Sequence, residues 1–187
     1  MEQRKSAMQY GELYFWTATI NSWKHLLAAD EMKMEVIQSL QWLKAKELVS
    51  IYAYVIMPNH LHLIWETNKP NGKEQPHSSL LKFTAHQFKK ILATTHPAWL
   101  EEFKVEAVNK QYEFWQRDSM AFPLFSRAVI NQKIDYIHHN PVSGKWQLAP
   151  FADAYRFSSS AFYQSGVDEF GLLTHIGTVY DRNHPGT

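Results

Sequence analysis

Two β-rich runs separated by a two-residue turn place the tightest constraint on how this chain folds. The first run covers residues 51–57 and the second covers residues 60–67, and both are rich in residue types that favour extended backbone. Pro58 and Asn59 stand between the runs, and both residue types are typical of turns. The pattern therefore predicts a tight β-hairpin.

The remaining elements are expected from residue type and apolar spacing. Aromatic and β-branched residues predict a strand over residues 13–20, and residues 104–117 alternate well enough to suggest one or two more. Three other segments have the spacing of amphipathic helices. These expected helices cover residues 30–48 with Asp30 as the cap, residues 79–93, and residues 126–140, which end before Pro141.

No shift in composition divides the chain into parts. Its 187 residues, with 45% hydrophobic content, are enough for one substantial core. We therefore expect a single domain over residues 1–187, with residues 147–187 as a C-terminal extension packed on it. The N-terminal residues contain no apolar stretch of signal-peptide or membrane-span length, so a cytoplasmic protein without membrane association is expected.

Two features of the composition limit the chemistry. The chain has no cysteine, so disulfides and thiolate metal sites are excluded, and any metal must be bound by nitrogen and oxygen atoms. The formal net charge is only +1, which is weak support for nucleic-acid binding unless the cations are clustered locally.

His60 and His62 are the first candidates for a functional site. Alternate side chains of a strand share a face, so both imidazoles project from one side of the expected hairpin and Leu61 projects from the other. Two imidazoles on one face can share a cation. The pair alone does not decide the matter, because most His-X-His pairs are surface or hydrogen-bonded histidines.

Tyr136 and Asn140 are the second pair of interest. They are four residues apart on the expected helix 126–140, which places the phenol and the amide on neighbouring turns of one helix face. Both residues also have a structural interpretation. Tyr136 lies between Ile134 and Ile137 and can pack into the core, and Asn140 can serve in the helix C-cap.

Four segments, taken together, resemble one protein family. Residues 54–64, with the sequence YVIMPNHLHLI, resemble the HUH signature of the single-tyrosine transposases, and particularly of the REP-associated tyrosine transposases. Residues 135–142, DYIHHNPV, resemble the nucleophile helix of that family. Residues 114–117 and 156–160 resemble its flanking segments. Four matches in the same order are far more specific than any one of them.

The resemblance implies a fold and an activity. The fold is α+β, of the ferredoxin- or RRM-like HUH nuclease type, with an antiparallel sheet of four to five strands and helices packed on it. The activity is that of a metal-dependent single-stranded DNA endonuclease and strand transferase, a transposase. In this chemistry a tyrosine attacks the DNA and forms a 5′-phosphotyrosine intermediate. The implied partners are single-stranded, hairpin or palindromic DNA and a second copy of the chain in a homodimer.

Carried onto this sequence, the resemblance makes Tyr136 the nucleophile and His60 and His62 the ligands of a divalent cation, Mg²⁺ or Mn²⁺. Asn140 is the candidate third ligand, either directly or through water. Related transposases more often have glutamine or another polar residue in this third role, so Asn140 departs from the usual pattern.

Several basic residues are candidates for contacts with DNA phosphates. They are Lys82, His86, Lys89 and Lys90 on the expected helix 79–93, and Arg117, Lys133 and Lys145 near the segments that resemble the family. Each of them can also be an ordinary solvated charge.

Two other functions stay open at this point. A metal-dependent phosphoesterase could use His60 and His62 without a tyrosyl intermediate, although Ile64 stands where a histidine-triad enzyme has its next histidine. A domesticated relative could bind hairpin nucleic acid without cutting it, which the near-neutral charge favours. A trapped protein–DNA adduct separates these functions from strand transfer.

Overall fold

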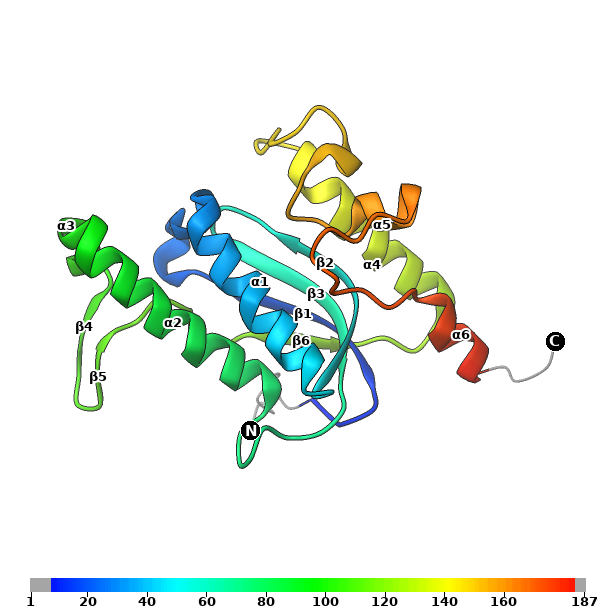
Figure 1. The fold of residues 1–187 in the computed structure, drawn as a ribbon, viewed down its shortest axis with the longest axis horizontal. Helices are drawn as coiled ribbons and strands as arrows, with labels where there is room; N and C mark the ends of the chain where they lie inside the picture. The colour runs from blue at the N-terminus through cyan, green and yellow to red at the C-terminus, as the bar shows by residue number, and fades with distance from the viewer. Residues whose placement is uncertain (1–7, 184–187) are drawn as a thin grey trace.

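A four-stranded antiparallel sheet organises the chain, whose residues 8–183 are described by a computed structural model (Figure 1). Residues 1–7 and 184–187 of the expected domain lie outside the described part. The strands lie in the order β2-β3-β1-β6. Their bounds are Leu13–Thr19 for β1, Val49–Ile56 for β2, His60–Thr67 for β3 and Met120–Pro123 for β6. The expected α+β class with four antiparallel strands is confirmed.

The predicted hairpin is formed by β2 and β3. Val55 pairs with His62 and Ile56 pairs with Leu61, and the backbone N–H of Met57 donates to the carbonyl of His60 over 2.8 Å. Pro58 and Asn59 occupy the turn between the strands, because neither needs to take part in the ladder there. Strand β1 pairs with the other side of β3, so β3 lies in the middle of the sheet.

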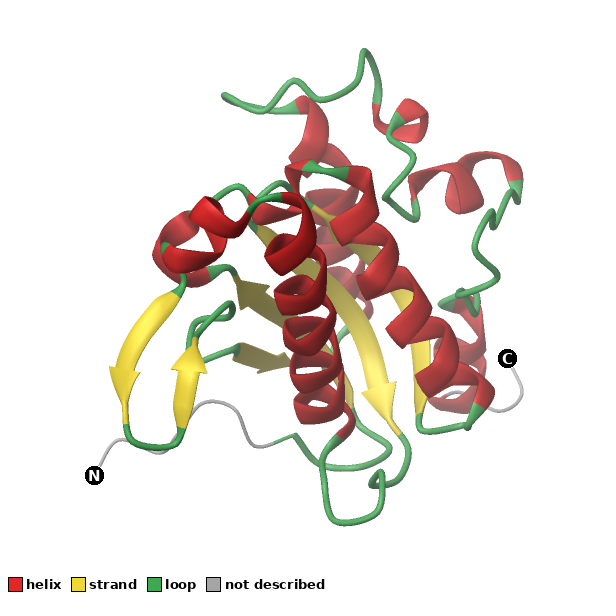
Figure 2. Cartoon of the chain, turned by 60° about the vertical axis from the view of Figure 1, so that its left-hand side comes forward, coloured by secondary structure: helices red, strands yellow, loops and turns green. Residues whose placement is uncertain are grey.

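Three long helices cover the sheet (Figure 2). They are α1 (Asp30–Ala45), α2 (Pro76–Thr95) and α4 (Arg127–His139). The shorter elements are α3 (Pro97–Glu101), α5 (Ser160–Ser165), α6 (Gly177–Asn183), and the strands β4 (Lys104–Ala107) and β5 (Lys110–Tyr112). Among residues 8–183, no helix combines the length and the apolar character needed to cross a membrane.

The structure corrects several expected boundaries. Helix α1 ends at Ala45 rather than near residue 48, because Glu47 has a left-handed φ of 56°, which stops the helix. Its N-cap is Ala29, and Asp30 lies in the first turn. Helix α2 begins at Pro76, three residues before the expected start, since proline is well tolerated in the first turn of a helix.

The largest difference between the sequence prediction and the structure concerns residues 104–123. The expected strands in the region of residues 104–117, β4 and β5, form a separate two-stranded sheet. The fourth strand of the main sheet is β6, which the sequence pattern did not predict. This strand has only four residues and ends at Pro123, and it pairs with β1 on one side only. A short edge strand tolerates proline because a missing donor costs little there.

The two faces of the sheet have different chemical character. On one face, here called the core face, Trp16, Leu61, Leu63 and Trp65 are fully buried. Helices α1 and α2 lie over this face (Figure 1), and the ring of Trp16 lies 6.3 Å from that of His77 on α2. The other face, here called the site face, carries Phe15, Thr17, His60 and His62 and lies against α4. Because side chains alternate along a strand, the same strand β3 supplies both faces.

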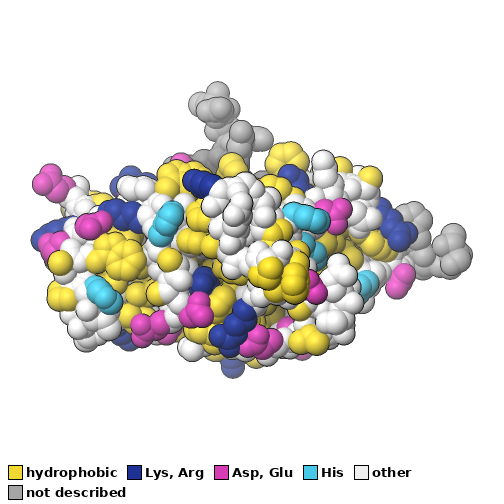
Figure 3. Space-filling view, turned by 90° about the horizontal axis from the view of Figure 1, so that it is seen from above, with side chains coloured by type: hydrophobic (Ala, Val, Ile, Leu, Met, Phe, Trp, Pro, Cys, Tyr) yellow, Lys and Arg dark blue, Asp and Glu magenta, His cyan; other side chains and the backbone are white. Residues whose placement is uncertain are grey.

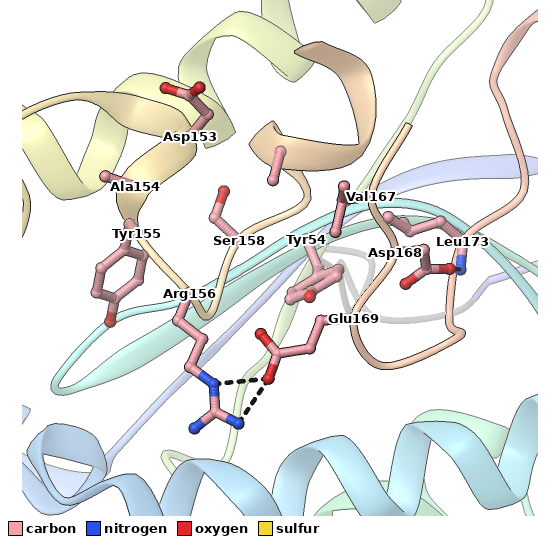
Figure 4. Close-up of a pocket in the computed structure, with 11 residues that line it drawn as sticks. Tyr54, Asp153, Ala154, Tyr155, Arg156, Ser158, Val167, Asp168, Glu169 and Leu173 are labelled. Atoms are coloured by element: carbon pink, nitrogen blue, oxygen red, sulfur yellow. Dashed lines mark hydrogen bonds and ion pairs between the residues drawn. The ribbon is translucent and has the colours of Figure 1, made fainter. Parts of the chain in front are cut away.

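The C-terminal residues cover the free edge of β2. The backbone N–H of Ile56 donates to the carbonyl of Phe157, that of Ser159 donates to Tyr54, and that of Thr174 donates to Ile51. Figure 4 shows the adjoining pocket, in which an ion pair between Arg156 and Glu169 lies near Tyr54. Paired in this way, the β2 edge offers no template for association with another strand.

Candidate active site

The hairpin places both histidines on the site face, as alternation predicts. His60 and His62 are buried, with exposed fractions of 8% and 6%, and their ring centroids are 4.8 Å apart. Phe15 of β1 stacks on His62 with a centroid distance of 5.1 Å. The neighbouring rings therefore fix where the imidazoles lie.

Hydrogen bonds fix which imidazole nitrogens are available. Nδ1 of His60 lies 2.6 Å from Oδ1 of Asn59, and since this amide oxygen can only accept, His60 Nδ1 carries the proton. The lone pair of His60 is therefore on Nε2. Nδ1 of His62 shares a hydrogen bond of 2.7 Å with the hydroxyl of Thr17. Nε2 of His62 is buried and has no partner among residues 8–183.

Burial also keeps both imidazoles neutral. Removal from water lowers the pKa of His60 to about 4, with the nearby charge of Lys145 as a smaller cause. Burial lowers the pKa of His62 to about 3, assisted by His60 and by Lys133. A neutral imidazole has a lone pair to give to a cation. Both histidines are therefore in the protonation state that a metal ligand needs.

Tyr136 lies beside these rings on α4. Its ring centroid is 5.3 Å from that of His62 and 6.0 Å from that of Phe15, and the side chain is 49% exposed. The ring is therefore not packed into the core, whereas the side chains of its helix neighbours Ile134 and Ile137 are buried. An exposed phenol beside the buried imidazole of His62 is an arrangement that a folding role does not require.

Two contacts hold α4 in this position. The hydroxyl of Ser126 caps its N-terminus by accepting from the N–H of Val129. Near its C-terminus, Nε2 of His138 lies 2.9 Å from the hydroxyl of Ser159, which also contacts the backbone of Tyr54 on β2. The tyrosine helix is thus tied to the sheet edge through the C-terminal segment.

Asn140 lies at the C-terminus of α4, where its backbone N–H donates to the carbonyl of Tyr136. Its side chain is buried, and its Nδ2 has no partner among residues 8–183. No group of three or more His, Asp or Glu side chains in this described part is arranged to hold a metal. A cation on His60 and His62 would therefore need the Asn140 amide, water or substrate oxygens to complete its ligand shell.

The donor atoms fit such a cation. Nε2 of His62 is a buried nitrogen left without a protein partner, and Nδ1 of each imidazole is hydrogen-bonded to a side-chain oxygen. This is the outer-shell arrangement that orients metal-binding histidines. Imidazole nitrogen with an amide oxygen suits Mn²⁺ and hydrated Mg²⁺, and Zn²⁺ could also bind.

The structure separates the expected basic residues into three sets. Lys133 and Lys145 lie near the imidazoles, since their charges contribute to the lowered pKa values of His62 and His60 respectively. Arg117 forms an ion pair with Glu113. Lys82, His86, Lys89 and Lys90 belong to α2, on the core-face side of the sheet; Lys82 is paired with Glu74, and Lys89 lies over the ring of Tyr112.

The surface seen in Figure 3 has Lys and Arg side chains interspersed with Asp and Glu. On this face the cations therefore form no continuous basic surface. Attraction of DNA would depend on a few cations near the site, such as Lys133 and Lys145, more than on a general positive potential.

Sequence reasoning missed four residues around the imidazoles: Thr17, Asn59, Trp23 and Trp146. Thr17 and Asn59 supply the hydrogen bonds to Nδ1 of the histidines. The rings of Trp23 and Trp146 lie 6.3 Å and 6.1 Å from that of His60. The position of Asn59 directly before His60 was a usable signal, whereas the other three reach the site only through tertiary structure.

Comparison with known proteins bears on the fold. No protein-family model matches the chain, and no curated protein matches it. Among solved structures, a REP-associated tyrosine transposase bound to a REP hairpin is similar with a TM-score of 0.60 and 18% identity, covering 94% of this chain and 93% of that one. A Deinococcus radiodurans R1 structure described as a transposase has a TM-score of 0.40 and 17% identity, covering 74% of this chain and 98% of that one. The chain therefore shares its fold, over nearly its whole length, with a REP-associated tyrosine transposase.

Proposed function

We propose that this chain is a single-tyrosine HUH transposase that cuts and rejoins single-stranded DNA. The observation that carries the proposal is the half-exposed ring of Tyr136, 5.3 Å from the ring of His62, whose Nε2 is buried without a protein partner. A nucleophile and a cation site are thereby adjacent, on the fold of a protein that is itself a tyrosine transposase. The four sequence segments that resemble this family support the same assignment.

His60 and His62 would hold a divalent cation through their Nε2 atoms, with Asn140 as the candidate third ligand. Asn59 and Thr17 would keep each Nδ1 protonated and both rings correctly oriented. When bound, Mg²⁺ or Mn²⁺ would neutralise charge on a non-bridging phosphate oxygen and orient the phosphorus for in-line attack.

Tyr136 would supply the nucleophile. Its phenolic oxygen would form a bond to phosphorus while the bond from phosphorus to the 3′-oxygen breaks, which leaves a 5′-phosphotyrosine and a free 3′-hydroxyl after that oxygen takes a proton. Lys133 lies one turn earlier on α4, with Nζ 5.8 Å from the Tyr136 ring centroid. Its ammonium is placed to stabilise negative charge on the phenolate or on the phosphate.

The resulting phosphotyrosine conserves the energy of the DNA linkage. Attack by another 3′-hydroxyl on the phosphorus would release the phenolate of Tyr136 and restore a phosphodiester, so strand transfer would need no ATP. The substrate that we propose is hairpin or palindromic DNA with single-stranded flanks, and the similar transposase structure is bound to a REP hairpin. Lys133 and Lys145 are the candidate phosphate contacts near the imidazoles, and Arg117, which is paired with Glu113, is a further candidate. A homodimer stays a prediction, which sedimentation of the free protein would test.

The test is covalent trapping. The purified chain is incubated with Mn²⁺ and a labelled pool of DNA hairpins with randomised single-stranded flanks, and denaturing gel electrophoresis detects protein that carries DNA. We expect an adduct that is lost in Tyr136→Phe and in chelator. Tyr10→Phe is the matched control, because Tyr10 is also exposed, at 41%, and should leave the adduct unchanged.

Two outcomes would contradict the proposal. An adduct of full yield in Tyr136→Phe would exclude this tyrosine as the nucleophile. Hairpin binding without any adduct in Mn²⁺ or Mg²⁺ would favour the domesticated binding protein instead. His60→Ala separates the roles further, because it should abolish the adduct and leave most of the hairpin affinity intact.

A further inference from the structure

Trp23 is held in an unusual position next to His60. Its side chain is 59% exposed, although large aromatic residues normally bury most of their surface. Ser22 and Trp23 both have a φ of 56°, a left-handed conformation that residues with side chains seldom adopt. Two such residues in succession are disfavoured and persist only where the surroundings determine them.

The turn of the β2–β3 hairpin supplies those surroundings. The side-chain amide of Asn59 donates from Nδ2 to the carbonyl of Trp23 over 3.2 Å, while its Oδ1 accepts from Nδ1 of His60. The backbone N–H of Ile20 donates to the carbonyl of Asn59, and that of Leu27 donates to Pro58. One asparagine therefore fixes both the loop that carries the indole and the imidazole beside it.

A second indole approaches His60 from another part of the chain. The ring centroid of Trp146 is 6.1 Å from that of His60, and Nζ of Lys145 lies 5.2 Å from the Trp146 ring centroid. The loop after α4 is held by the N–H of Leu148, which donates to the carbonyl of Pro141 over 2.7 Å. Two indoles and an ammonium group thus surround one imidazole of the candidate cation site.

We propose that Trp23 is a stacking surface for an unpaired nucleobase of the nucleotide next to the phosphate at His60, with Trp146 as a second aromatic contact beside it. This inference rests on the proposed function, because the phosphate at His60 is what places a base within reach of the indole. Every base has a π-face, so stacking of this kind holds a single strand in place with little sequence preference. The ammonium group of Lys145 supplies a positive charge that can pair with an adjoining phosphate.

The test uses two probes of equal length and charge, a short labelled oligothymidylate and an abasic oligomer with the same sugar–phosphate backbone. Binding is measured by fluorescence anisotropy with Mn²⁺ present, in chains that all carry Tyr136→Phe, so that the cation site is filled and no cleavage takes place. We expect Trp23→Ala to weaken binding of oligothymidylate on the order of tenfold, the loss typical of one stacked base, and to leave abasic binding within about twofold. Trp23→Phe should retain most of the affinity.

Two further variants keep the test decisive. Trp23→Asn removes the indole but suits the left-handed backbone, so its loss of affinity cannot be assigned to a disturbed loop. Trp42→Ala is the matched control, because Trp42 is also half-exposed, at 48%, but lies on α1 on the core-face side. An equal loss on both probes, an equal loss in Trp42→Ala, or no loss in either Trp23 variant would overturn the proposal.

The stacking test and the trapping test can fail separately. If the Trp23 variants lose base-dependent affinity while the unaltered chain forms no adduct, Trp23 binds bases and the proposed strand transfer is wrong. If the adduct forms and the Trp23 variants bind both probes normally, strand transfer stands and the stacking surface is wrong.

Discussion

The two faces of β3 contain side chains of opposite kinds at alternating positions. Leu61 and Leu63 point to the core face, where they are fully buried among apolar neighbours below α1 and α2. His60 and His62 point to the site face and are nearly as buried, yet His62 Nε2 has no partner in the described chain. A buried polar atom without a partner costs stability and calls for an explanation.

This difference between the two faces indicates which face stabilises the fold and which face carries the candidate site. The core face is mostly apolar and enclosed by helices, although the indole nitrogens of Trp16 and Trp65 there also lack partners in the described chain. On the site face the unpartnered atom is an imidazole nitrogen next to a second histidine and an exposed phenol, an arrangement that is understandable if a cation and a substrate phosphate complete the site.

The largest expected difference between substitutions on the two faces is in the free energy of unfolding. Leu63→Ala should lower the free energy of unfolding by about 2–5 kcal/mol, because it leaves a cavity in a closely packed core. The paired change Thr17→Val with His62→Phe should alter it by only about 1 kcal/mol, since both partners of a buried hydrogen bond are replaced by apolar groups of similar shape. Denaturant unfolding measures both. Equal destabilisation by the two changes would mean that the site face is also essential to the fold.

The second-largest expected effect is on the affinity for a divalent cation. Asn59→Ala removes the acceptor for Nδ1 of His60, so Mn²⁺ binding measured by titration calorimetry should weaken about 10- to 100-fold, as for other outer-shell partners. Asn68→Ala, at the other end of the hairpin, is the control and should leave Mn²⁺ affinity unchanged. Unaltered affinity in Asn59→Ala would show that this amide does not orient a metal ligand.

Buried histidines should make the stability of the chain depend on pH, and they include His77 on α2, whose pKa burial also lowers. Burial lowers the pKa of His60 to about 4, of His62 to about 3 and of His138 to about 4, all below the ordinary value of about 6.5. The unfolded chain therefore binds more protons between these values. Stability from each histidine is complete above pH about 6.5 and is lost as the pH falls toward the folded pKa, by up to about 1.4 kcal/mol per pH unit.

The double variant with Thr17→Val and His62→Phe sharpens this expectation. It lacks one of the imidazoles whose pKa burial lowers, so its unfolding free energy should fall less steeply between pH 6.5 and pH 4 than that of the unaltered chain. Denaturant unfolding at several pH values gives the two slopes. Identical slopes would show that His62 titrates in the folded protein as it does in the unfolded chain.

The smallest expected effects concern DNA affinity. Lys133→Ala and Lys145→Ala, on the site face, should each weaken hairpin binding a few-fold and reduce its salt dependence by about one phosphate contact. Lys82→Ala and Lys89→Ala on α2 should change it less, because these cations lie beyond the core face and contact Glu74 and Tyr112. Filter binding at several salt concentrations measures both sets. A larger loss from the α2 variants would place the DNA on the opposite side of the sheet.

Sequence alone predicted the elements whose determinants are local. The hairpin follows from Pro58 and Asn59 between two β-rich runs, and α4 begins and ends within a residue of where Ser126 and Pro141 place it. Strand β6 could not be predicted in the same way, because it has four residues and is defined by its pairing with β1.

The residues of the candidate site were likewise predicted only in part. Alternation along a strand puts His60 and His62 on one face, and the resemblance to the transposases predicts Tyr136 as their partner, whose ring the structure places 5.3 Å from that of His62. Trp23 could not be found, since its indole comes near His60 only after two distant turns pack together. Nor does the sequence reveal that Lys82 and Lys89 belong to a helix on the other side of the sheet.

Mapping the residue that becomes attached to DNA tests the central claim most directly. The trapped adduct would be digested with a protease and a nuclease, and tandem mass spectrometry would locate the amino acid that carries the residual nucleotide. The chain has nine tyrosines, and we expect the modification on Tyr136 alone. A nucleotide on any other residue would contradict the proposed arrangement of the tyrosine helix and the paired imidazoles.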